Sequence, residues 1–224
     1  YLTDCAGVGQ VDARPELVVG QPGKGGQVGL PRFARAAEIA DSGAGGVEAV
    51  AICFMHSYAN PAHEEAAARV VERLMPDAYL SVSSRVLPQV RFYERTSTTV
   101  LNAAVGPILQ RYVANLRRRL AEAGYRGALR IMQSNGGVTS PEAVAALAAS
   151  TLLSGPAAAP TAGLAALVPH DEDSFVTVDM GGTSFDAALV VGGAPSITTA
   201  SSVSRFALAL PSMDIVTIGA GGGS

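Results

Sequence analysis

A chain of 224 residues with 48% hydrophobic and 16% charged residues can bury a substantial core, so we expect a globular protein of one large or two small domains. Nineteen acidic against sixteen basic residues give a formal net charge of −3, and the longest basic tract, 117–119, is short, which argues against a nucleic-acid surface. The two cysteines, Cys5 and Cys53, suggest neither a disulfide framework nor a zinc site. The apolar runs are too short to cross a membrane, and we expect a cytoplasmic protein.

The first half of the chain alternates helix and strand patterns. Residues 1–30 are rich in glycine and have little hydrophobic periodicity, which predicts a loop. After them we expect a helix over 31–42, a strand over 47–54, a helix over 61–75 and a strand over 78–83. Asn60 can cap the second helix, and Pro61 suits its first position. The strand-helix-strand succession favours a parallel pair joined by a right-handed crossover.

The second half begins with a helical pattern over 97–123, in which Pro107 marks a kink or a break between two helices. Thr96 or Ser97 would cap this helix, and Glu94 and Arg95 would pair at the surface, or alternatively contact a substrate. The later patterns predict, in order, a strand over 129–133, a glycine turn over 134–139, alanine-rich helices from 140 and from 154, a β-hairpin over 175–191, a Ser/Thr-rich loop over 196–204 and a strand over 215–218.

The turn of the predicted hairpin, Asp-Met-Gly-Gly-Thr-Ser over 179–184, has the composition of a phosphate-binding turn. Gly181 and Gly182 let the backbone approach an anion, and consecutive N–H groups in such a turn can form an anion-binding nest. The hydroxyls of Thr183 and Ser184 can donate hydrogen bonds to phosphate oxygens. A strand, and not a helix, follows the turn, so the segment is neither a P-loop nor a Rossmann turn.

Two acidic residues flank this turn, Asp179 before it and Asp186 after it. A carboxylate beside a polyphosphate is tolerated mainly when Mg²⁺, often through its waters, neutralises both. The turn therefore predicts a site for a Mg-nucleotide. The alternative is an ordinary β-hairpin whose glycines only supply positive φ.

Three further pairs of residues could bring backbone groups to a ligand: Gly136 and Gly137, Ser154 and Gly155, and Gly221 and Gly222. The first pair lies in a polar turn at a strand end, where ligands of α/β proteins gather, and the second pair opens a predicted helix, whose N-terminus attracts phosphate. The third pair lies in a glycine run that leaves space beside the last strand. The respective alternatives are an ordinary loop, a helix cap and a frayed chain end.

Several motifs occur in the order typical of one family: SYANPAHE, SVSSRVLPQVRFYERTSTTVLNAAVGPIL, IMQSNGGVTS, TLLSGPAAAPTAG, VDMGGTSFD and TIGAGGGS. The chain resembles the hydantoinase A/5-oxoprolinase family from about Val47 to Ser224. Its strand, Gly-Gly-Thr turn and second strand also resemble the phosphate hairpin of the actin, sugar kinase and Hsp70 ATPases. The resemblance implies an α/β fold, namely an actin-like (ribonuclease H-like) ATPase lobe with strand-helix-strand units and a phosphate-binding β-hairpin.

The resemblance also implies roles and a division of the chain. Asp179 and Asp186 would be catalytic, with Asp179 holding Mg²⁺ through water and Asp186 bracing the turn or a metal-bound water, while the glycine and hydroxyl residues named above would contact ATP. Residues 1–90 would end an N-terminal lobe, and 91–224 would form a core lobe, truncated at its end. The family usually has a second such hairpin, so we expect the central part of a longer protein. Phe185 departs from the family, where a small hydroxyl residue is common.

Members of the resembling family use ATP to open cyclic amides. We therefore expect an ATP- and Mg²⁺-dependent hydrolase of hydantoin, N-methylhydantoin or 5-oxoproline, in which phosphorylation activates the ring carbonyl. The three histidines lie in unrelated contexts, and no Ser-His-Asp or Cys-His arrangement supports a covalent route. The alternatives are an ATP-using subunit of an acetone-type ketone carboxylase and a non-catalytic nucleotide-binding or assembly module. We also expect an oligomer, with a second hydantoinase or carboxylase subunit as a candidate partner.

Overall fold

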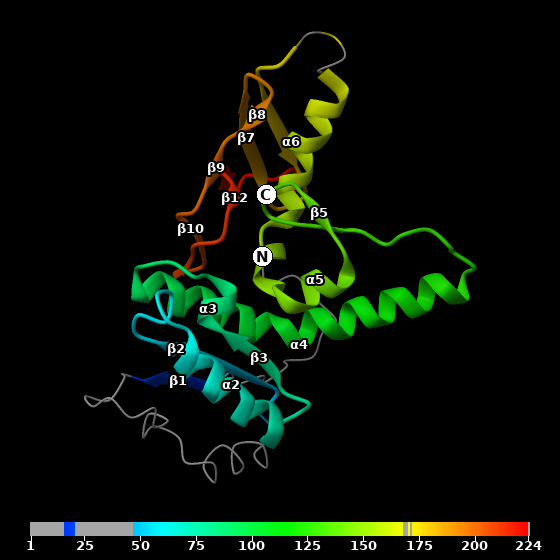
Figure 1. The fold of residues 1–224 in the computed structure, drawn as a ribbon. Coiled ribbons are helices and arrows are strands. Elements are labelled where there is room, and N and C mark those ends of the chain that lie inside the picture. Colours follow the sequence, from blue (N-terminus) through cyan, green and yellow to red (C-terminus); the bar gives the residue numbers. More distant parts are fainter. Residues whose placement is uncertain (1–15, 21–46, 168–169, 171, 224) are drawn as a thin grey trace.

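The computed structural model of the protein describes residues 16–20, 47–167, 170 and 172–223 (Figure 1). One region contains a three-stranded sheet in the order β1 (Glu16–Gly20), β2 (Ala49–Phe54) and β3 (Tyr79–Val82). The other region contains a four-stranded sheet in the order β13 (Ile215–Ile218), β7 (Phe185–Val191) and β6 (Phe175–Met180), with β8 (Ala194–Pro195) paired to β7. The long helix α4 (Phe92–Glu122) runs between the two regions (Figure 1).

The predicted strand-helix-strand unit is present in the first region. β2 is followed by α2 (Ala62–Leu74) and β3, and the two strands pair in parallel, with Ala49 opposite Tyr79 and Ile52 opposite Val82. The Asn60 side chain accepts a hydrogen bond from the N–H of Ala62 at 3.1 Å. Asn60 therefore satisfies one of the free donors at the start of α2. Pro61 is the N-cap residue of this helix, one position before the place that the sequence predicted for it.

β1 corrects the expectation of a loop over residues 1–30. Residues Glu16–Gly20 form a strand that pairs in parallel with β2, with Glu16 opposite Val50 and Gly20 opposite Phe54. The sequence of this strand, ELVVG, contains two β-branched residues, which suit a strand, but its short apolar run lies among glycines that are typical of loops. The helix expected over 31–42 lies outside the described residues.

β2 is buried along its whole length, and its alternate side chains face two different helices. Val50 and Ile52 pack in a cluster with Ala68 and Val71 of α2. The small side chains on the opposite side of β2 pack with Ala103 of α4. Burying each larger aliphatic side chain stabilises the fold by roughly 1.5–3 kcal/mol. The parallel sheet is thus covered by α2 on one face and by α4 on the other.

α4 begins at Phe92, ahead of the expected start at Ser97, and it continues without a break through Pro107. A proline lacks the N–H that would bond the carbonyl of Ala103, which weakens a helix by about 3 kcal/mol. Packing against β2, β3, β11 (Phe206–Leu208) and the 3-10 turn η1 (Ala148–Thr151) offsets this loss. Of the two alternatives at Pro107, a kink or a break, the break is therefore wrong, because tertiary contacts outweigh the local cost.

Hydroxyl groups on the first turns of α4 hold a segment from the C-terminal half of the chain. Ser97 Oγ donates to the carbonyl oxygen of Ala207 at 2.8 Å. Thr98 Oγ1 accepts a hydrogen bond from the N–H of Ala209 at 3.0 Å, and Thr98 is fully buried. The sequence suggested that Ser97 could cap the helix, but it does not. Instead, it connects α4 to the segment that leads to the second sheet.

Asn102 makes a second connection between α4 and the rest of the protein. Its Oδ1 accepts a hydrogen bond from the N–H of Ala149 at 2.9 Å, and its Nδ2 donates to Ser81 Oγ at 2.6 Å and to the Tyr79 hydroxyl at 3.2 Å. The Tyr79 hydroxyl donates in turn to the carbonyl of Ala146 at 3.2 Å. Burial raises the pKa of Tyr79, so this hydroxyl remains a donor at neutral pH.

A buried polar network joins α2, the end of β2, α3 (Ser83–Val86) and α4. Glu64 accepts hydrogen bonds from the N–H of Phe54 at 2.7 Å, from Ser83 Oγ at 2.6 Å and from the N–H of Ser84 at 2.8 Å. Arg95 donates to Ser83 Oγ at 3.1 Å and to the carbonyl of Phe54 at 2.8 Å. Glu64 is fully buried and Arg95 is 1% exposed. We call these five residues the Glu64–Arg95 network.

The position of Arg95 corrects the expectation of a surface pair with Glu94. The Arg95 guanidinium lies 5.5 Å from the ring centroid of Tyr58 and 5.6 Å from that of Phe92, within range of a cation–π interaction. Glu94 lies 3.7 Å from the guanidinium of Arg91 instead. Because α4 begins at Phe92, Arg95 falls in its first turn and faces the core.

The C-terminal half contains one longer helix and several short strands. Its remaining elements are β4 (Ile131–Met132), β5 (Val138–Thr139), α5 (Pro141–Ala146), α6 (Ser154–Leu167), β9 (Ile197–Thr198), β10 (Ser201–Val203) and β12 (Ser212–Met213). β9 pairs with β12 and β10 pairs with β11, which corrects the expectation of a loop over 196–204. Serine and threonine are common in loops, and only partners distant in sequence turn this segment into strands. The predicted hairpin over 175–191 and the strand over 215–218 are confirmed.

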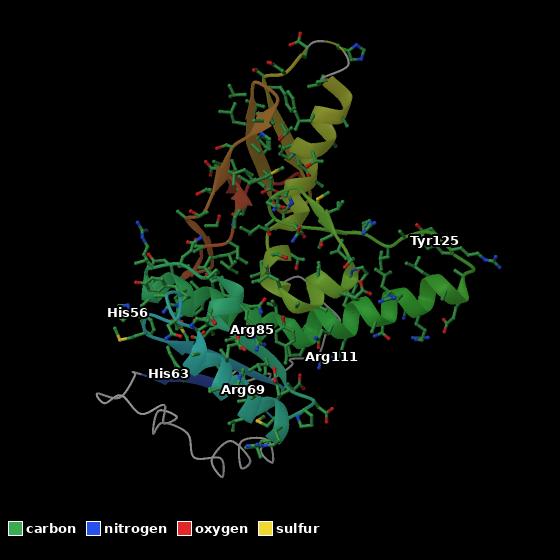
Figure 2. The ribbon with its side chains drawn as sticks, viewed as in Figure 1. His56, His63, Arg69, Arg85, Arg111 and Tyr125 are labelled. Atoms are coloured by element: carbon green, nitrogen blue, oxygen red, sulfur yellow. The ribbon has the colours of Figure 1, made fainter. Side chains whose placement is uncertain are left out.

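The side chains labelled in Figure 2 belong to the first region, to α4 and, for Tyr125, to the segment that follows α4. Arg85 pairs with Glu65, and Arg111 pairs with Glu48 at 2.9 Å. His56 follows β2 (Figure 2), and among the described residues no group of three or more His, Cys, Asp or Glu side chains could hold a metal ion. None of the described helices is long and apolar enough to cross a membrane.

Replacing Glu64 with alanine should lower the free energy of unfolding by about 3–5 kcal/mol, because Arg95 would keep a buried charge and two backbone N–H groups would lose their acceptor. Urea denaturation followed by circular dichroism measures this loss. Glu65→Ala is the matched control on the same helix, since its partner Arg85 is half exposed, and we expect a loss of at most about 1 kcal/mol. Equal losses in the two variants would show that the Glu64–Arg95 network is no stronger than a surface ion pair.

Candidate functional site

The turn between β6 and β7 is open to solvent and closed at its base by strand pairing. Met180 lies opposite Phe185 in the register, and the N–H of Gly181 donates to the carbonyl of Ser184 at 3.0 Å. Gly181, Gly182 and the residue that follows are exposed. The predicted hairpin therefore presents the backbone of its turn at the surface.

Gly181 and Gly182 are not required by the conformation of the turn itself. Neither has a positive φ, unlike Gly192 and Gly193 in the next turn of the sheet. A Cβ added at either position would have no atom within 4 Å. The alternative that these glycines only supply positive φ is therefore wrong. What they do provide is backbone that another group can approach closely.

The glycine run after β13 lies against this turn. The N–H of Gly222 donates to the carbonyl of Gly181 at 3.0 Å, and the N–H of Gly223 donates to the carbonyl of Gly182 at 2.9 Å. A Cβ added at Gly221 would lie 2.4 Å from a backbone nitrogen of the turn, so no side chain fits there. Two glycine segments that are distant in the sequence thus meet, and the run is not a frayed end.

Asp179, Asp186 and Thr217 form a row across three neighbouring strands, which we call the carboxylate row. Asp186 lies opposite Asp179 of β6 on one side and opposite Thr217 of β13 on the other, and directly opposed residues of antiparallel strands share a face of the sheet. Asp186 is 8% exposed and accepts hydrogen bonds from Thr217 Oγ1 at 2.5 Å and from Ser184 Oγ at 3.4 Å. Asp179 is exposed. Asp186 therefore braces the hairpin, and Asp179 presents its carboxylate to solvent.

The electrostatics of the row favour a bound cation. Two carboxylates directly opposite each other on a sheet repel, and a cation between or beside them removes this repulsion. Asp179 and Asp186 are too few for a metal site built wholly from protein side chains. They fit Mg²⁺, which proteins usually hold through one or two carboxylates while waters and substrate phosphates complete the octahedron.

α6 brings Ser154 and Gly155 to the same end of the second sheet as the turn. Gly163, in the middle of α6, packs on β6, where an added Cβ would lie 2.6 Å from the Phe175 ring. α6 and β6 run in opposite directions (Figure 1). Ser154, at the start of α6, therefore lies roughly 14 Å along the helix axis from Gly163, in the direction of the turn. The free N–H groups of a helix start carry partial positive charge, which favours an anion.

Gly136 and Gly137 belong to the tight turn between β4 and β5. Gly136 has a φ of +80°, and the N–H of Gly137 donates to Asn135 Oδ1 at 2.9 Å, which is the behaviour of an ordinary loop. Thr161 Oγ1 of α6 lies 3.3 Å from the carbonyl oxygen of Gly136. This turn supports α6 from the side, and the positive φ of Gly136 explains that glycine without a ligand.

Two residues outside the predicted set position the site. Ser134 Oγ donates to the carbonyl of Ser150 at 2.8 Å and accepts a hydrogen bond from the N–H of Leu153 at 3.0 Å, which fixes the chain just before α6. Thr217 donates to Asp186, as described above. In the sequence, the signal for Thr217 is a hydroxyl residue in the strand that leads into the glycine run.

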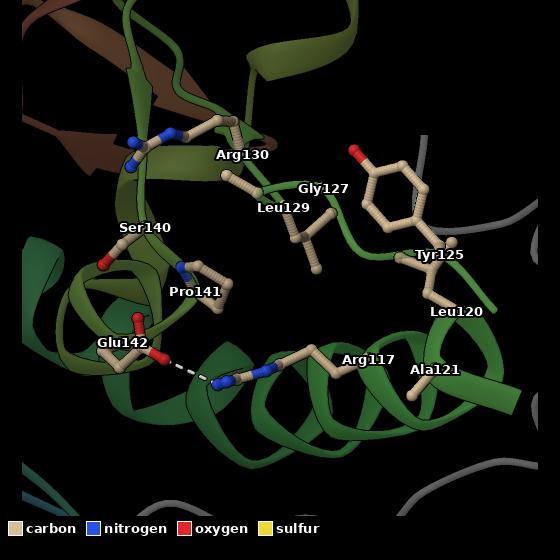
Figure 3. Close-up of a pocket in the computed structure, with 11 residues that line it drawn as sticks. Arg117, Leu120, Ala121, Tyr125, Gly127, Leu129, Arg130, Ser140, Pro141 and Glu142 are labelled. Atoms are coloured by element: carbon tan, nitrogen blue, oxygen red, sulfur yellow. Dashed lines mark hydrogen bonds and ion pairs between the residues drawn. The ribbon is translucent and has the colours of Figure 1, made fainter.

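One cavity of about 340 Å³ lies between the last turns of α4 and the start of α5 (Figure 3). Arg117 and Glu142 form an ion pair of 2.6 Å at its edge, and Tyr125 and Arg130 also line it. No residue of the predicted site lines this cavity. It therefore takes no part in the arrangement around the β6–β7 turn.

The architecture is that of an α/β lobe in which a strand-turn-strand hairpin carries two opposed carboxylates. The sequence model for hydantoinase/oxoprolinase matches residues 95–224, and the model for the hydantoinase/oxoprolinase N-terminal region matches residues 32–75. The chain belongs to the hydantoinase/oxoprolinase family. The resemblance found in the sequence motifs is thereby confirmed.

Individual relatives are similar over most of this chain. Caprolactamase subunit alpha of Pseudomonas jessenii is 42% identical over 178 residues, which cover 80% of this chain and 26% of the relative. The crystal structure of the ATP-dependent caprolactamase of Pseudomonas jessenii matches with 37% identity and a TM-score of 0.71 over 88% of this chain and 29% of that one. Nucleotide-free acetone carboxylase matches with 26% identity and a TM-score of 0.70 over 84% and 27%. The chain thus spans about a quarter of the length of these relatives. The two structural matches confirm the predicted fold, an actin-like ATPase lobe.

Replacing Gly221 with alanine should separate the glycine run from the turn, because the added Cβ would meet backbone atoms. Amide hydrogen exchange at Gly222 and Gly223 should become roughly fivefold to tenfold faster, which corresponds to the loss of about 1 kcal/mol per hydrogen bond. Gly219→Ala is the control, since a Cβ there has no atom within 4 Å. Unchanged exchange in Gly221→Ala would show that the two segments do not need their close approach.

Proposed function

We propose that this chain is the central part of an ATP-dependent hydrolase that opens cyclic amides. The observation that carries the proposal is the meeting of the Gly181–Gly182 turn with the Gly221–Gly223 run beside the exposed carboxylate of Asp179. Backbone that a ligand can approach closely, with an acidic residue beside it, suits a phosphate and its Mg²⁺. The relatives named caprolactamase support a cyclic amide as the substrate.

We assign roles along the carboxylate row and the turn. Gly182 and Thr183 contact the phosphates through backbone N–H groups and the Thr183 hydroxyl, while Gly181, whose N–H bonds the carbonyl of Ser184, leaves room for the phosphates because it has no side chain. Asp179 would hold Mg²⁺, and Asp186 keeps the hairpin in place. Mg²⁺ bound there would supply positive charge that stabilises the transferring phosphoryl group. The start of α6, at Ser154 and Gly155, adds a favourable dipole.

The proposed reaction balances in three steps. The amide oxygen attacks the γ-phosphorus of ATP, so a new O–P bond forms, the bond to the bridging oxygen breaks, and ADP leaves with the electron pair. Water then adds to the activated carbon, and the ring C–N bond breaks as the nitrogen takes up a proton. A second water releases inorganic phosphate from the resulting acyl phosphate. The residues of this chain hold and orient the phosphoryl group, which is the larger part of catalysis in phosphoryl transfer.

A ketone carboxylase subunit is the second candidate function. The similarity to acetone carboxylase supports it, since the same turn could direct a phosphoryl group to a different oxygen. Stimulation of ATP hydrolysis by hydantoins, or by acetone with bicarbonate, separates the two functions in the complete enzyme. The higher identity to caprolactamase makes cyclic-amide opening our first choice.

We further propose that the chain works within a larger assembly in the cytoplasm, where ATP is available. One face of the four-stranded sheet exposes aliphatic and methionine side chains, each at least 49% exposed: Val176, Val178, Met180, Leu189, Val191, Val216 and Ile218. Apolar area of this kind marks a contact surface. The relative named as a subunit also supports an assembly.

We also propose a division of the chain into residues 1–90 and 91–224. The separate family matches at 32–75 and 95–224 support this division. A purely non-catalytic module remains the third candidate.

Replacing Asp179 with alanine should abolish the Mg²⁺-dependent part of ATP binding, because the exposed carboxylate that would hold the ion is removed. Isothermal titration calorimetry of the purified chain with ATP, with and without Mg²⁺, measures this dependence. We expect at least about a tenfold weaker Kd for Mg-ATP, which corresponds to 1.4 kcal/mol.

Asp173→Ala is the matched control, because Asp173 is also exposed and lies near the opposite end of β6. Its Mg-ATP affinity should equal that of the unmodified chain. Equal affinity in Asp179→Ala, or ATP binding that does not depend on Mg²⁺, would contradict the assignment of the site.

A further inference from the structure

A second cavity, which we call the hydroxyl pocket, adjoins the carboxylate row. It has a volume of about 360 Å³ and lies between the start of α6 and the strands β9, β10, β12 and β13. Pockets of this size are suited to small-molecule ligands. None of the predicted site residues lines it, and no role has been assigned to it above.

The polar lining of the hydroxyl pocket consists mostly of neutral hydroxyl groups. They come from Thr198, Ser201, Ser202 and Thr217. Thr217 already donates to Asp186, Ser201 pairs with Ser212, and Thr198 accepts from the N–H of Ala200. The Thr198 and Ser202 hydroxyls can still donate to a carbonyl oxygen, and the oxygen atom of Thr217 can still accept from an amide N–H. The wall thus offers both kinds of partner that an amide group needs.

The rest of the lining is apolar. Leu153 and Pro156 contribute from the start of α6, and Met213 and Ile215 contribute from the opposite side. Methylene groups of a ligand would lose contact with water against these side chains, which is favourable. A ligand with one polar edge and one hydrocarbon edge therefore matches the two kinds of wall.

The charge of the hydroxyl pocket excludes one kind of ligand. Asp214 is the one ionisable side chain among its lining residues, and no Lys, Arg or His belongs to that set. A carboxylate in the pocket would face Asp214, and no basic side chain of the lining would compensate its charge, which is unfavourable. The pocket is thus suited to an uncharged ligand.

The position of the pocket connects it to the proposed chemistry. Thr217 lines the pocket and also donates to Asp186 at 2.5 Å, so a ligand there lies directly beside the carboxylate row. The adenine ring of ATP is separated from the terminal phosphoryl group by the ribose and two phosphates. A ring that must receive that phosphoryl group, by contrast, has to lie next to it.

We infer that the hydroxyl pocket binds the ring of an uncharged cyclic amide and discriminates against a ring that carries a carboxylate. The inference rests on the proposed function, whose substrate it narrows from cyclic amides in general to neutral lactams and hydantoins. Asp214 and the absence of a basic side chain in the lining set this preference. On this basis 5-oxoproline, although a lactam, is a poor ligand.

The test uses two probes that share a ring and differ by one carboxylate, 2-pyrrolidone and 5-oxoproline. Ligand-observed NMR titration of the purified chain, in the presence of saturating Mg-ATP, gives both dissociation constants. We expect 2-pyrrolidone to bind at least about tenfold more tightly than 5-oxoproline. Asp214→Lys should improve 5-oxoproline binding at least about tenfold and change 2-pyrrolidone binding less than about twofold. Asp173→Lys, the same charge change outside the pocket, should alter neither.

A second variant tests the location. Ala200 lines the pocket and is exposed, so Ala200→Trp fills the space without disturbing a buried side chain. It should abolish 2-pyrrolidone binding while Mg-ATP binding stays unchanged, which also shows that the variant is folded. Ala194→Trp, on the exposed strand β8, is the control and should bind both ligands normally.

The outcomes separate this inference from the proposed function. Mg-ATP binding without any preference for 2-pyrrolidone, or lactam binding that survives Ala200→Trp, would overturn the inference and leave the nucleotide site standing. Displacement of 2-pyrrolidone by adenosine would reassign the pocket to the nucleoside and overturn the inference as well. Loss of Mg-dependent ATP binding in the unmodified chain would overturn the proposed function itself.

Discussion

Burial of the Glu64 carboxylate and the Arg95 guanidinium constrains the rest of the structure. A buried charge is tolerated only when its hydrogen bonds are made with good geometry, so the groups around it cannot shift independently. Here Ser83 bridges the two side chains, and the backbone at Phe54 bonds to both of them. The end of β2 and the starts of α2, α3 and α4 are therefore held in one arrangement.

α4 carries this constraint to the candidate site. Its first turn is fixed by Arg95, and its next turns hold the chain at Ala207 and Ala209 through Ser97 and Thr98. One turn further, Asn102 holds η1, which precedes α6. Both the strands around the hydroxyl pocket and the helix that covers the second sheet are thus attached to the same helix. The polar residues at the start of α4, which suggested a cap or a substrate contact, act in this structure as connections between the two regions.

The site itself combines a rigid frame with unbalanced charge. Asp186 is buried and accepts hydrogen bonds from Thr217 and Ser184, whereas Asp179 beside it is exposed. The hairpin thus keeps two acidic groups together although they repel, because strand pairing over the whole length of β6 outweighs a repulsion of a few tenths to 1 kcal/mol. A frame that already holds the repelling groups binds a cation without first having to order them.

The sequence by itself determined the family, the strand-helix-strand unit, the hairpin and its acidic residues, since each depends on local periodicity or on a contiguous motif such as DMGGTS. It could not determine the strand at Glu16–Gly20, the strands within 196–204 or the continuity of α4 through Pro107, because distant partners stabilise all three against local preference. Nor could it show that Gly221–Gly223 pair with the turn or that Thr217 bonds Asp186. Those contacts join residues more than thirty positions apart, and only the tertiary fold brings them together.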